Sequence, residues 1–174
     1  MRKFTTKDLT LAAMVAALYA VMSYFGNIFG LTFGPIQFRF AEALTVLPFL
    51  FPVTAPGLFV GCLITNLLSP YGPLDIVFGS LATLLAALWT AKMPNRWLAP
   101  LPPVICNMVL VGFTISFAET GFSAALPAAW IYNGITVGIG ELGACYILGS
   151  ILLTILPRIS YFHAMIPERR LVQP

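Results

Sequence analysis

Three polar side chains lie close together in a stretch that is otherwise apolar, at Gln37, Arg39 and Glu42. The stretch reads Ile-Gln-Phe-Arg-Phe-Ala-Glu-Ala-Leu-Thr-Val-Leu-Pro over 36–48. An ionisable side chain at the centre of a bilayer costs about 2.5 kcal/mol or more, so it rarely faces lipid. On a helix, Arg39 and Glu42 would share one side, where the two side chains can touch. This pattern has two interpretations, a polar binding site or an internal ion pair that only fixes helix packing.

The composition places this stretch in a membrane protein. The chain has 174 residues, of which 59% are hydrophobic and 9% charged, whereas a soluble domain carries roughly 25% charged residues. We therefore predict an integral membrane protein that forms a single transmembrane domain over 1–174. The net charge of +3 does not indicate nucleic-acid binding, because the basic residues lie at the ends of apolar runs.

Six apolar runs predict an all-α bundle of six membrane-spanning helices. A full span needs about 20 apolar residues, and the second and third runs are shorter, so a re-entrant hairpin is the alternative for that pair. Strand patterning is absent, because no run alternates apolar and polar residues as a membrane barrel requires. The expected spans are 8–29, 36–51, 55–69, 73–92, 99–118 and 132–157, and a short cytoplasmic tail follows over 160–174.

The distribution of basic residues sets the expected orientation. Cytoplasmic loops carry an excess of Lys and Arg. With the N-terminus inside, every basic residue except Arg39 falls on the cytoplasmic side. We therefore predict that both termini are cytoplasmic (N-in and C-in) and that the protein is a multi-pass protein of the cell membrane.

In that orientation, polar residues from several sequence-distant helices reach a similar depth in the outer leaflet. Polar groups that converge in an apolar, concave setting are the usual signature of a ligand site. Carboxylates outnumber the one arginine, so we expect a small, donor-rich ligand that is neutral or cationic. The candidate substrate-binding residues are Gln37, Arg39, Glu42, Asn66, Asp75, Asn107 and Glu141, with Glu119 and Asn133 at the same outer depth.

Other chemistry finds little support in the sequence. There is no phosphate-binding Gly-x-x-x-x-Gly-Lys-Ser/Thr motif, and the one histidine, His163, lies past the last expected span. The three cysteines lie far apart in apolar runs and are interpreted as packing residues. We therefore expect no metal, no cofactor and no catalytic residue.

Small residues mark one side of the first expected helix. Ala12, Ala16 and Ala20 are spaced four apart, as are Ala13 and Ala17. Such a surface lets another helix approach closely. It predicts either contact with a partner subunit or packing within the chain.

The residues quoted so far also carry a family likeness. Gln37-Phe-Arg-Phe-Ala-Glu-Ala-Leu-Thr-Val-Leu-Pro48, the segment Pro56 to Leu68, the segment Asp75 to Ala86, Leu101 to Asn107 and Gly140-Glu-Leu together resemble the QueT family. The likeness runs over most of the chain, to about Pro157. It implies a substrate-binding (S) component of an energy-coupling-factor (ECF) transporter for queuosine precursors. It also implies a transmembrane T subunit and two ATPase subunits as partners, with the alanine-rich first helix docking on the T subunit.

The resemblance suggests how the site would be used. A 7-deazaguanine presents a ring N–H and an amino group side by side, which one carboxylate can accept together. Glu42 or Glu141 is the candidate for that edge and Asp75 for a second contact, while Arg39 orients Glu42. The alternatives are an S component for another small heterocycle or vitamin, a small integral membrane enzyme, and a purely structural membrane subunit.

Overall fold

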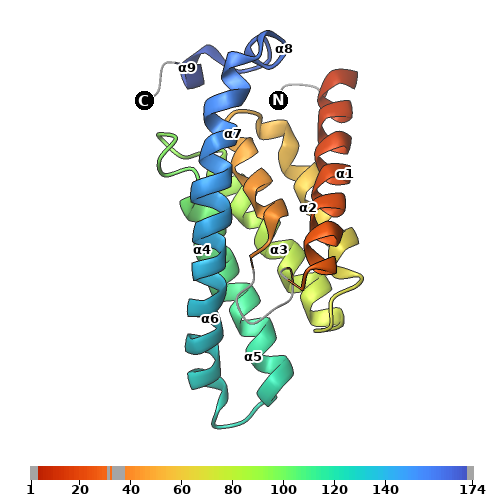
Figure 1. Ribbon diagram of the computed structural model, residues 1–174, viewed down its shortest axis with the longest axis vertical. Helices are drawn as coiled ribbons and strands as arrows, with labels where there is room; N and C mark the ends of the chain where they lie inside the picture. The colour runs from red at the N-terminus through yellow and green to blue at the C-terminus, as the bar shows by residue number, and fades with distance from the viewer. Residues whose placement is uncertain (1–3, 31, 33–37, 172–174) are drawn as a thin grey trace.

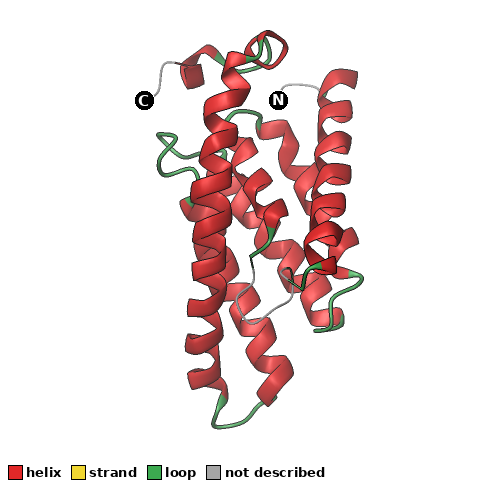
Figure 2. Ribbon diagram, viewed as in Figure 1, coloured by secondary structure: helices red, strands yellow, loops and turns green. Residues whose placement is uncertain are grey.

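The computed structural model describes residues 4–30, 32 and 38–171, and all regular secondary structure in those ranges is helical (Figure 2). Four helices are long and apolar enough to cross a membrane: α1 (Thr6–Ile28), α3 (Pro73–Thr90) and the continuous helices Leu101–Thr120 and Leu126–Arg158. Two shorter apolar stretches, Phe40–Phe49 and Pro52–Asn66, lie between α1 and α3. The described chain is therefore an all-helical, multi-pass membrane protein.

Several of these helices change their winding along their length. The two long continuous helices each contain a π-helical segment, and the first short stretch is a 3₁₀ helix. The remaining elements are η1 (Phe40–Phe49), η2 (Pro52–Thr54), α2 (Ala55–Asn66), α4 (Leu101–Cys106), η3 (Asn107–Val111), α5 (Gly112–Thr120), α6 (Leu126–Leu142), η4 (Gly143–Gly149), α7 (Ser150–Ile155), η5 (Leu156–Arg158), α8 (Ser160–His163) and α9 (Glu168–Leu171).

The helices form an elongated bundle along one long axis (Figure 1). The two chain ends lie at the same end of this bundle, where α8 and α9 fold across it, and the connection between α5 and α6 lies at the opposite end (Figure 1). Within 160–171 the chain is packed rather than free, because Ile166 is only 5% exposed and belongs to a core cluster with Phe49 and Phe51.

The observed helix bounds differ from the expected spans at two places. The last long helix begins at Leu126, although the last span was expected to begin at 132. Pro127 lies in its first turn, a position that suits proline because no intrahelical N–H bond is lost there. The second expected span, 36–51, contains a helix only from Phe40 within the described residues.

The small residues of α1 pack mostly inside the molecule. A Cβ on Gly57 of α2 would lie 2.1 Å from the carbonyl oxygen of Ala12, and one on Gly61 would lie 2.7 Å from that of Ala16. Ala12, Ala16 and Ala20 are buried (7–8% exposed), so these three alanines pack within the chain. Of the five alanines of α1, only Ala13 and Ala17 are exposed.

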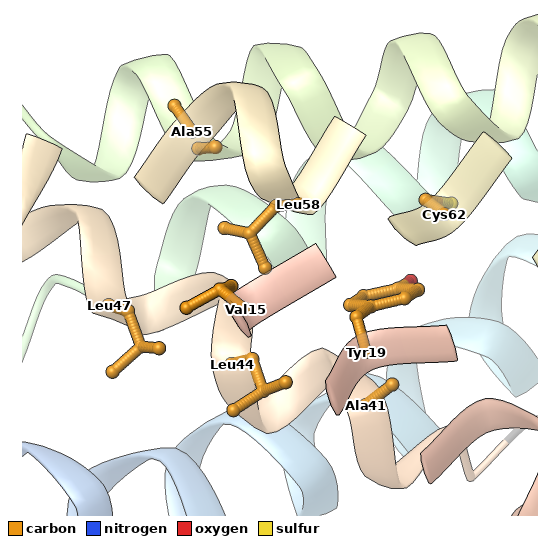
Figure 3. Close-up of a cluster of buried hydrophobic side chains, with 9 residues drawn as sticks. Val15, Tyr19, Ala41, Leu44, Leu47, Ala55, Leu58 and Cys62 are labelled. Atoms are coloured by element: carbon orange, nitrogen blue, oxygen red, sulfur yellow. The ribbon is translucent and has the colours of Figure 1, made fainter. Parts of the chain in front are cut away.

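This close approach positions one core cluster. Val15 and Tyr19 from α1 meet Leu44 and Leu47 from η1 and Leu58 from α2 (Figure 3). Tyr19 and Leu58 are completely buried. Burying side chains of this size gains about 1.5–3 kcal/mol each in water, but in a bilayer the gain comes from packing. The cluster fixes η1 between α1 and α2, with Glu42 near the start of η1.

Candidate ligand site

The candidate site residues within the described chain are buried. The exposed fraction is 0% for Glu42, Asn66 and Asp75 and 1% for Arg39, Asn107 and Glu141. These six side chains come from η1 with its preceding residue, and from α2, α3, η3 and α6. Charged side chains are almost never this buried unless they are paired. Gln37 lies outside the described residues.

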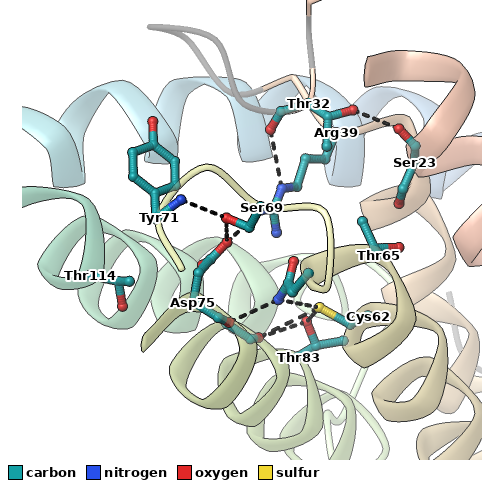
Figure 4. A network of polar contacts seen from close by, with 12 residues as sticks. Ser23, Thr32, Arg39, Cys62, Thr65, Ser69, Tyr71, Asp75, Thr83 and Thr114 are labelled. Carbon is teal, nitrogen blue, oxygen red and sulfur yellow. Dashed lines mark hydrogen bonds and ion pairs between the residues drawn. The ribbon is translucent and has the colours of Figure 1, made fainter. Parts of the chain in front are cut away.

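Arg39 and Asp75 form an ion pair that links the start of η1 to the start of α3 (Figure 4). Arg39 Nη2 lies 3.7 Å from Asp75 Oδ2, and Arg39 Nε donates to the carbonyl of Thr32 at 3.3 Å. The same Asp75 oxygen accepts a hydrogen bond from the Ser69 hydroxyl at 2.5 Å. Tyr71 donates its backbone N–H to that hydroxyl at 3.2 Å.

This pairing corrects the expectation that Arg39 would pair with Glu42. Arg39 precedes η1 and has extended backbone angles (φ −86°, ψ 104°). The rule that residues three apart share a side applies only within a helix. The Arg39 side chain therefore reaches α3, while Glu42 takes a different partner.

Asn66 is the last residue of α2, and its side chain donates a hydrogen bond to the first turn of α3. Its amide nitrogen donates to the backbone carbonyl of Asp75 at 3.0 Å and to Cys62 Sγ at 3.4 Å. A Cβ on Gly79 would lie 2.6 Å from that nitrogen and 2.9 Å from Asp75 Oδ1. The missing Cβ at Gly79 therefore leaves room for the ends of Asn66 and Asp75 as they lie here.

Glu42 accepts a hydrogen bond from the hydroxyl of Tyr19 on α1, and both side chains are completely buried. Cys145 Sγ lies 3.4 Å from the Glu42 backbone carbonyl and 3.5 Å from Glu141 Oε2. The Asn107 amide lies beside both the Glu42 and the Glu141 carboxyl groups. These contacts bring η1, η3 and α6 to one place.

Several polar atoms of this cluster have no hydrogen-bond partner among the described residues. Leaving a buried donor or acceptor unpaired costs about 1–3 kcal/mol, so these atoms could form further hydrogen bonds. The atoms are Glu42 Oε2, Asn66 Oδ1, Asp75 Oδ1, Ser80 Oγ and both amide atoms of Asn107.

Helix distortions coincide with these residues. Asn107 begins the π-helical η3, and the π-helical η4 starts two residues after Glu141 and contains Cys145. Such π-segments occur frequently at functional sites. η1 is a 3₁₀ helix of ten residues, whereas runs longer than about 3–4 residues are uncommon. The three elements that contain or adjoin Glu42, Asn107 and Glu141 therefore all depart from regular α-helix.

Two polar residues expected at the same depth form a separate network. Asn133 donates to Glu119 Oε2 at 2.8 Å and to the Ser116 hydroxyl at 3.0 Å. Glu119 is exposed near the end of α5. Among the described residues, no hydrogen bond joins this pair to Glu42 or Asp75.

The structure adds residues that sequence reasoning missed. Tyr19 holds one oxygen of Glu42, and Ser69 holds one oxygen of Asp75. Thr83 donates to Cys62 Sγ at 3.2 Å beneath Asn66. A tyrosine in an apolar helix looks like an interfacial residue. The sequence signal for Tyr19 was its position next to Ala20, on a helix where close contact with another helix was expected.

Comparison with known proteins identifies the family. The family model described as "QueT transporter" matches residues 9–158. A curated protein of Lactococcus lactis subsp. cremoris (strain MG1363), named "Queuosine precursor transporter QueT", is 35% identical over 159 residues, which cover 84% of this chain and 90% of the relative. No solved structure matches the chain. Both matches are to transporters, not enzymes, and the chain belongs to the QueT transporter family.

Proposed function

We propose that this chain captures a 7-deazaguanine precursor of queuosine at the buried polar cluster, as the substrate-binding subunit of an ECF importer. The family and the name of the relative support the substrate class. The observation that carries the proposal is the group of unpaired polar atoms on Glu42, Asp75, Asn66 and Asn107. Most of these atoms are acceptors, which suits a ligand rich in N–H groups.

The charge balance of the cluster supports a neutral or cationic ligand. Three carboxyl groups, on Glu42, Asp75 and Glu141, are buried around the guanidinium of Arg39. Arg39 makes its ion pair with Asp75. An unpaired buried charge is strongly unfavourable, so the pair Glu42 and Glu141 gains most from donors that a ligand brings. A dianionic ligand would add repulsion instead.

Hydrogen bonds within the protein already occupy one carboxyl oxygen of each acidic residue in the cluster, and this limits how a base would bind. Tyr19 takes one oxygen of Glu42, Cys145 contacts one of Glu141, and Ser69 takes one of Asp75. No single carboxylate therefore offers both oxygens. We propose that the adjacent ring N–H and amino groups are shared between Glu42 and Glu141, with Asn107 beside them.

The other half of the cluster would meet the opposite side of the ligand. Asp75 Oδ1 and Asn66 Oδ1 are the unpaired acceptors there, and an aminomethyl substituent is a donor that they would suit. Tyr71 lies beside the Asp75 network (Figure 4) and is the candidate to pack on the ring. Gln37 and Arg39 complete the proposed set of ligand-binding residues.

The proposed topology has six membrane spans in one transmembrane domain over residues 1–174, with both termini cytoplasmic. Basic residues occur at the start of α1, in the α3–α4 connection, in η5 and in α9, namely Lys7, Lys92, Arg96, Arg158 and Arg170. The start of α1 and α9 lie at one end of the bundle (Figure 1), which the positive-inside rule assigns to the cytoplasm. The second span, built on η1, would cross only part of the bilayer, because ten 3₁₀ residues extend about 20 Å of the roughly 30 Å core. The ligand site would then face the outside of the cell membrane.

Coupling to a T subunit and two ATPase subunits is the second part of the proposal. The exposed side of α1 carries Ala13 and Ala17 beside large apolar side chains such as Met14 and Leu18. A groove of about 460 Å³ runs between this side, η1 and α7, and Ala17 lines it. This surface, rather than the Ala12 side, is the proposed docking site for the T subunit.

A thermal-stability assay with a ligand panel tests the substrate class. The detergent-purified protein would be heated with the nitrile, aminomethyl and free-base forms of the deazaguanine, and with guanine, riboflavin and thiamine. A ligand at about 100 times its dissociation constant stabilises the folded state by about 2.7 kcal/mol. We expect stabilisation by a deazaguanine alone. Stabilisation by a vitamin alone would overturn the substrate, and no shift with any ligand would overturn the site.

A further inference from the structure

A pocket rich in arginine is lined by residues of η1, α7, η5, α8, α9 and the α3–α4 connection. In Figure 1, α8 and α9 lie at the end of the bundle opposite the α5–α6 connection. The volume of the pocket is about 280 Å³. Arg96 from the α3–α4 connection, Arg158 from η5, His163 from α8 and Arg170 from α9 line it. No acidic residue is among its lining residues, so the pocket has the charge of an anion site.

Arg170 builds one wall of this pocket and holds the chain end against the bundle. Its two terminal nitrogens donate to the carbonyls of Ala91 and Met93, each at 2.6 Å. Its guanidinium carbon lies 4.5 Å from the centre of the Phe49 ring. These contacts fix α9 across the cytoplasmic-side ends of α3 and η1, and so they give the pocket a defined shape.

The other two arginines are available to a ligand. Arg96 rests on the ring of Trp97 at 5.1 Å, and its Nε has no hydrogen-bond partner among the described residues. Arg158 is exposed. Across 4–30, 32 and 38–171, neither makes an ion pair.

The setting of the pocket matches the level of lipid headgroups. Trp97 and Trp89 are 61% and 41% exposed nearby, and tryptophans of this kind gather at the membrane interface. A smaller adjoining pocket of about 50 Å³ shares Arg96 and Thr154 and leads along α7. Along that helix Ile151 and Ile155 are 48% and 50% exposed, which suits contact with acyl chains.

We propose that this pocket binds the phosphate headgroup of an anionic phospholipid, whose acyl chains lie along the exposed side of α7. Basic pockets between membrane helices are known to bind such headgroups. The site is separate from the buried ligand cluster and does not depend on the proposed substrate. Its effect would be to hold the chain end, through α8 and α9, against the bundle.

Native mass spectrometry and thermal stability of the protein in phosphatidylcholine nanodiscs test this proposal. Phosphatidylglycerol would be added to one set and inorganic phosphate to another. We expect phosphatidylglycerol to be retained and to stabilise the protein, and inorganic phosphate to do neither. Equal stabilisation by inorganic phosphate would overturn the lipid assignment.

Substitution of the lining arginines tests whether phosphatidylglycerol binds in this pocket. Arg96→Gln with Arg158→Gln should weaken retention of phosphatidylglycerol by about fivefold for each arginine removed. Lys92→Gln, an exposed basic residue of the same connection that does not line the pocket, should behave as wild type. Arg96→Lys with Arg158→Lys should keep most of the retention. The site would be overturned if wild type and the three variants retained phosphatidylglycerol equally. It would also be overturned if the double lysine variant lost as much retention as the double glutamine variant. If the double glutamine variant does not fold, Arg158→Gln alone, at an exposed side chain, gives the same comparison.

Discussion

The guanidinium of Arg39 lies 3.7 Å from the carboxylate of Asp75, and both side chains are almost fully buried. The pair joins the residue that precedes η1 to the first turn of α3. It therefore connects η1, which carries Glu42, to α3, which carries Gly79. The geometry of the candidate site depends on this one contact more than on any other charged pair in the described chain.

Asp75→Asn should strongly destabilise the protein. The substitution leaves the Arg39 guanidinium buried without its counter-charge, and breaking a buried pair in this way costs about 3–5 kcal/mol. The thermal unfolding midpoint in detergent would measure the loss. The double variant Arg39→Gln with Asp75→Asn should recover part of it, because no unpaired charge remains. An Asp75→Asn protein as stable as wild type would show that the pair does not hold η1 to α3.

Tyr19→Phe should weaken ligand binding by releasing Glu42. The variant removes the hydroxyl that holds Glu42, so the carboxylate loses its orientation and one buried oxygen loses its partner, at a cost of about 1–3 kcal/mol. Calorimetric titration with the deazaguanine identified by the ligand panel would measure the affinity. Tyr24→Phe on the same helix is the matched control, because its hydroxyl bonds only to the Ile64 carbonyl at an exposed position. Equal affinities for the two variants would contradict the role of Tyr19.

Gly79→Ala should impair binding more than folding. The new Cβ would meet Asn66 Nδ2 at 2.6 Å and Asp75 Oδ1 at 2.9 Å, so the ends of these two side chains must move. Gly57→Ala provides the contrast, because its Cβ would meet the backbone of Ala12 at 2.1 Å, where overpacking costs about 1–3 kcal/mol of stability. Affinity and unfolding midpoint would be measured for both. The account is contradicted if Gly79→Ala binds ligand as wild type does.

Ala17→Trp should separate binding from transport. Ala17 is exposed and lines the groove beside α1, so a bulky side chain there should block docking of the T subunit. We expect ligand binding to persist while uptake by the reconstituted importer is lost. Ala16→Trp should instead fail to fold, because Ala16 is buried against Gly61. Normal uptake by Ala17→Trp would remove this surface from the proposed interface.

The burial of several polar residues could be predicted from the sequence, because a polar side chain in a long apolar run rarely faces lipid. Glu42, Asn66, Asp75, Asn107 and Glu141 were predicted to be ligand-binding residues on these grounds, and the structure buries all five. Their assignment to a ligand stays a prediction. The helical class was confirmed. Packing within the chain was one of the two interpretations of the small residues on the first helix, and Ala12 and Ala16 do pack closely against Gly57 and Gly61.

What could not be predicted depended on local winding and on distant partners. The pairing of Arg39 with Glu42 was wrong because helix spacing was assumed where the chain is extended. The inward direction of Ala12, Ala16 and Ala20 was not determined by their spacing, since Ala13 and Ala17 follow the same period one residue later. The packed position of Arg170 depends on carbonyls at Ala91 and Met93, and backbone acceptors leave no trace in a sequence.

The most direct test of the central claim is a binding titration that compares Glu42→Gln and Glu141→Gln with wild type. Each substitution keeps the shape of the side chain and replaces an acceptor oxygen with an N–H donor, and leaving a buried donor without an acceptor costs about 1–3 kcal/mol. The account predicts that each variant loses affinity for the deazaguanine by roughly 10-fold or more. Glu119→Gln, at an exposed carboxylate outside the cluster, should bind as wild type. Wild-type affinity in both Glu42→Gln and Glu141→Gln would contradict the account and place the ligand elsewhere.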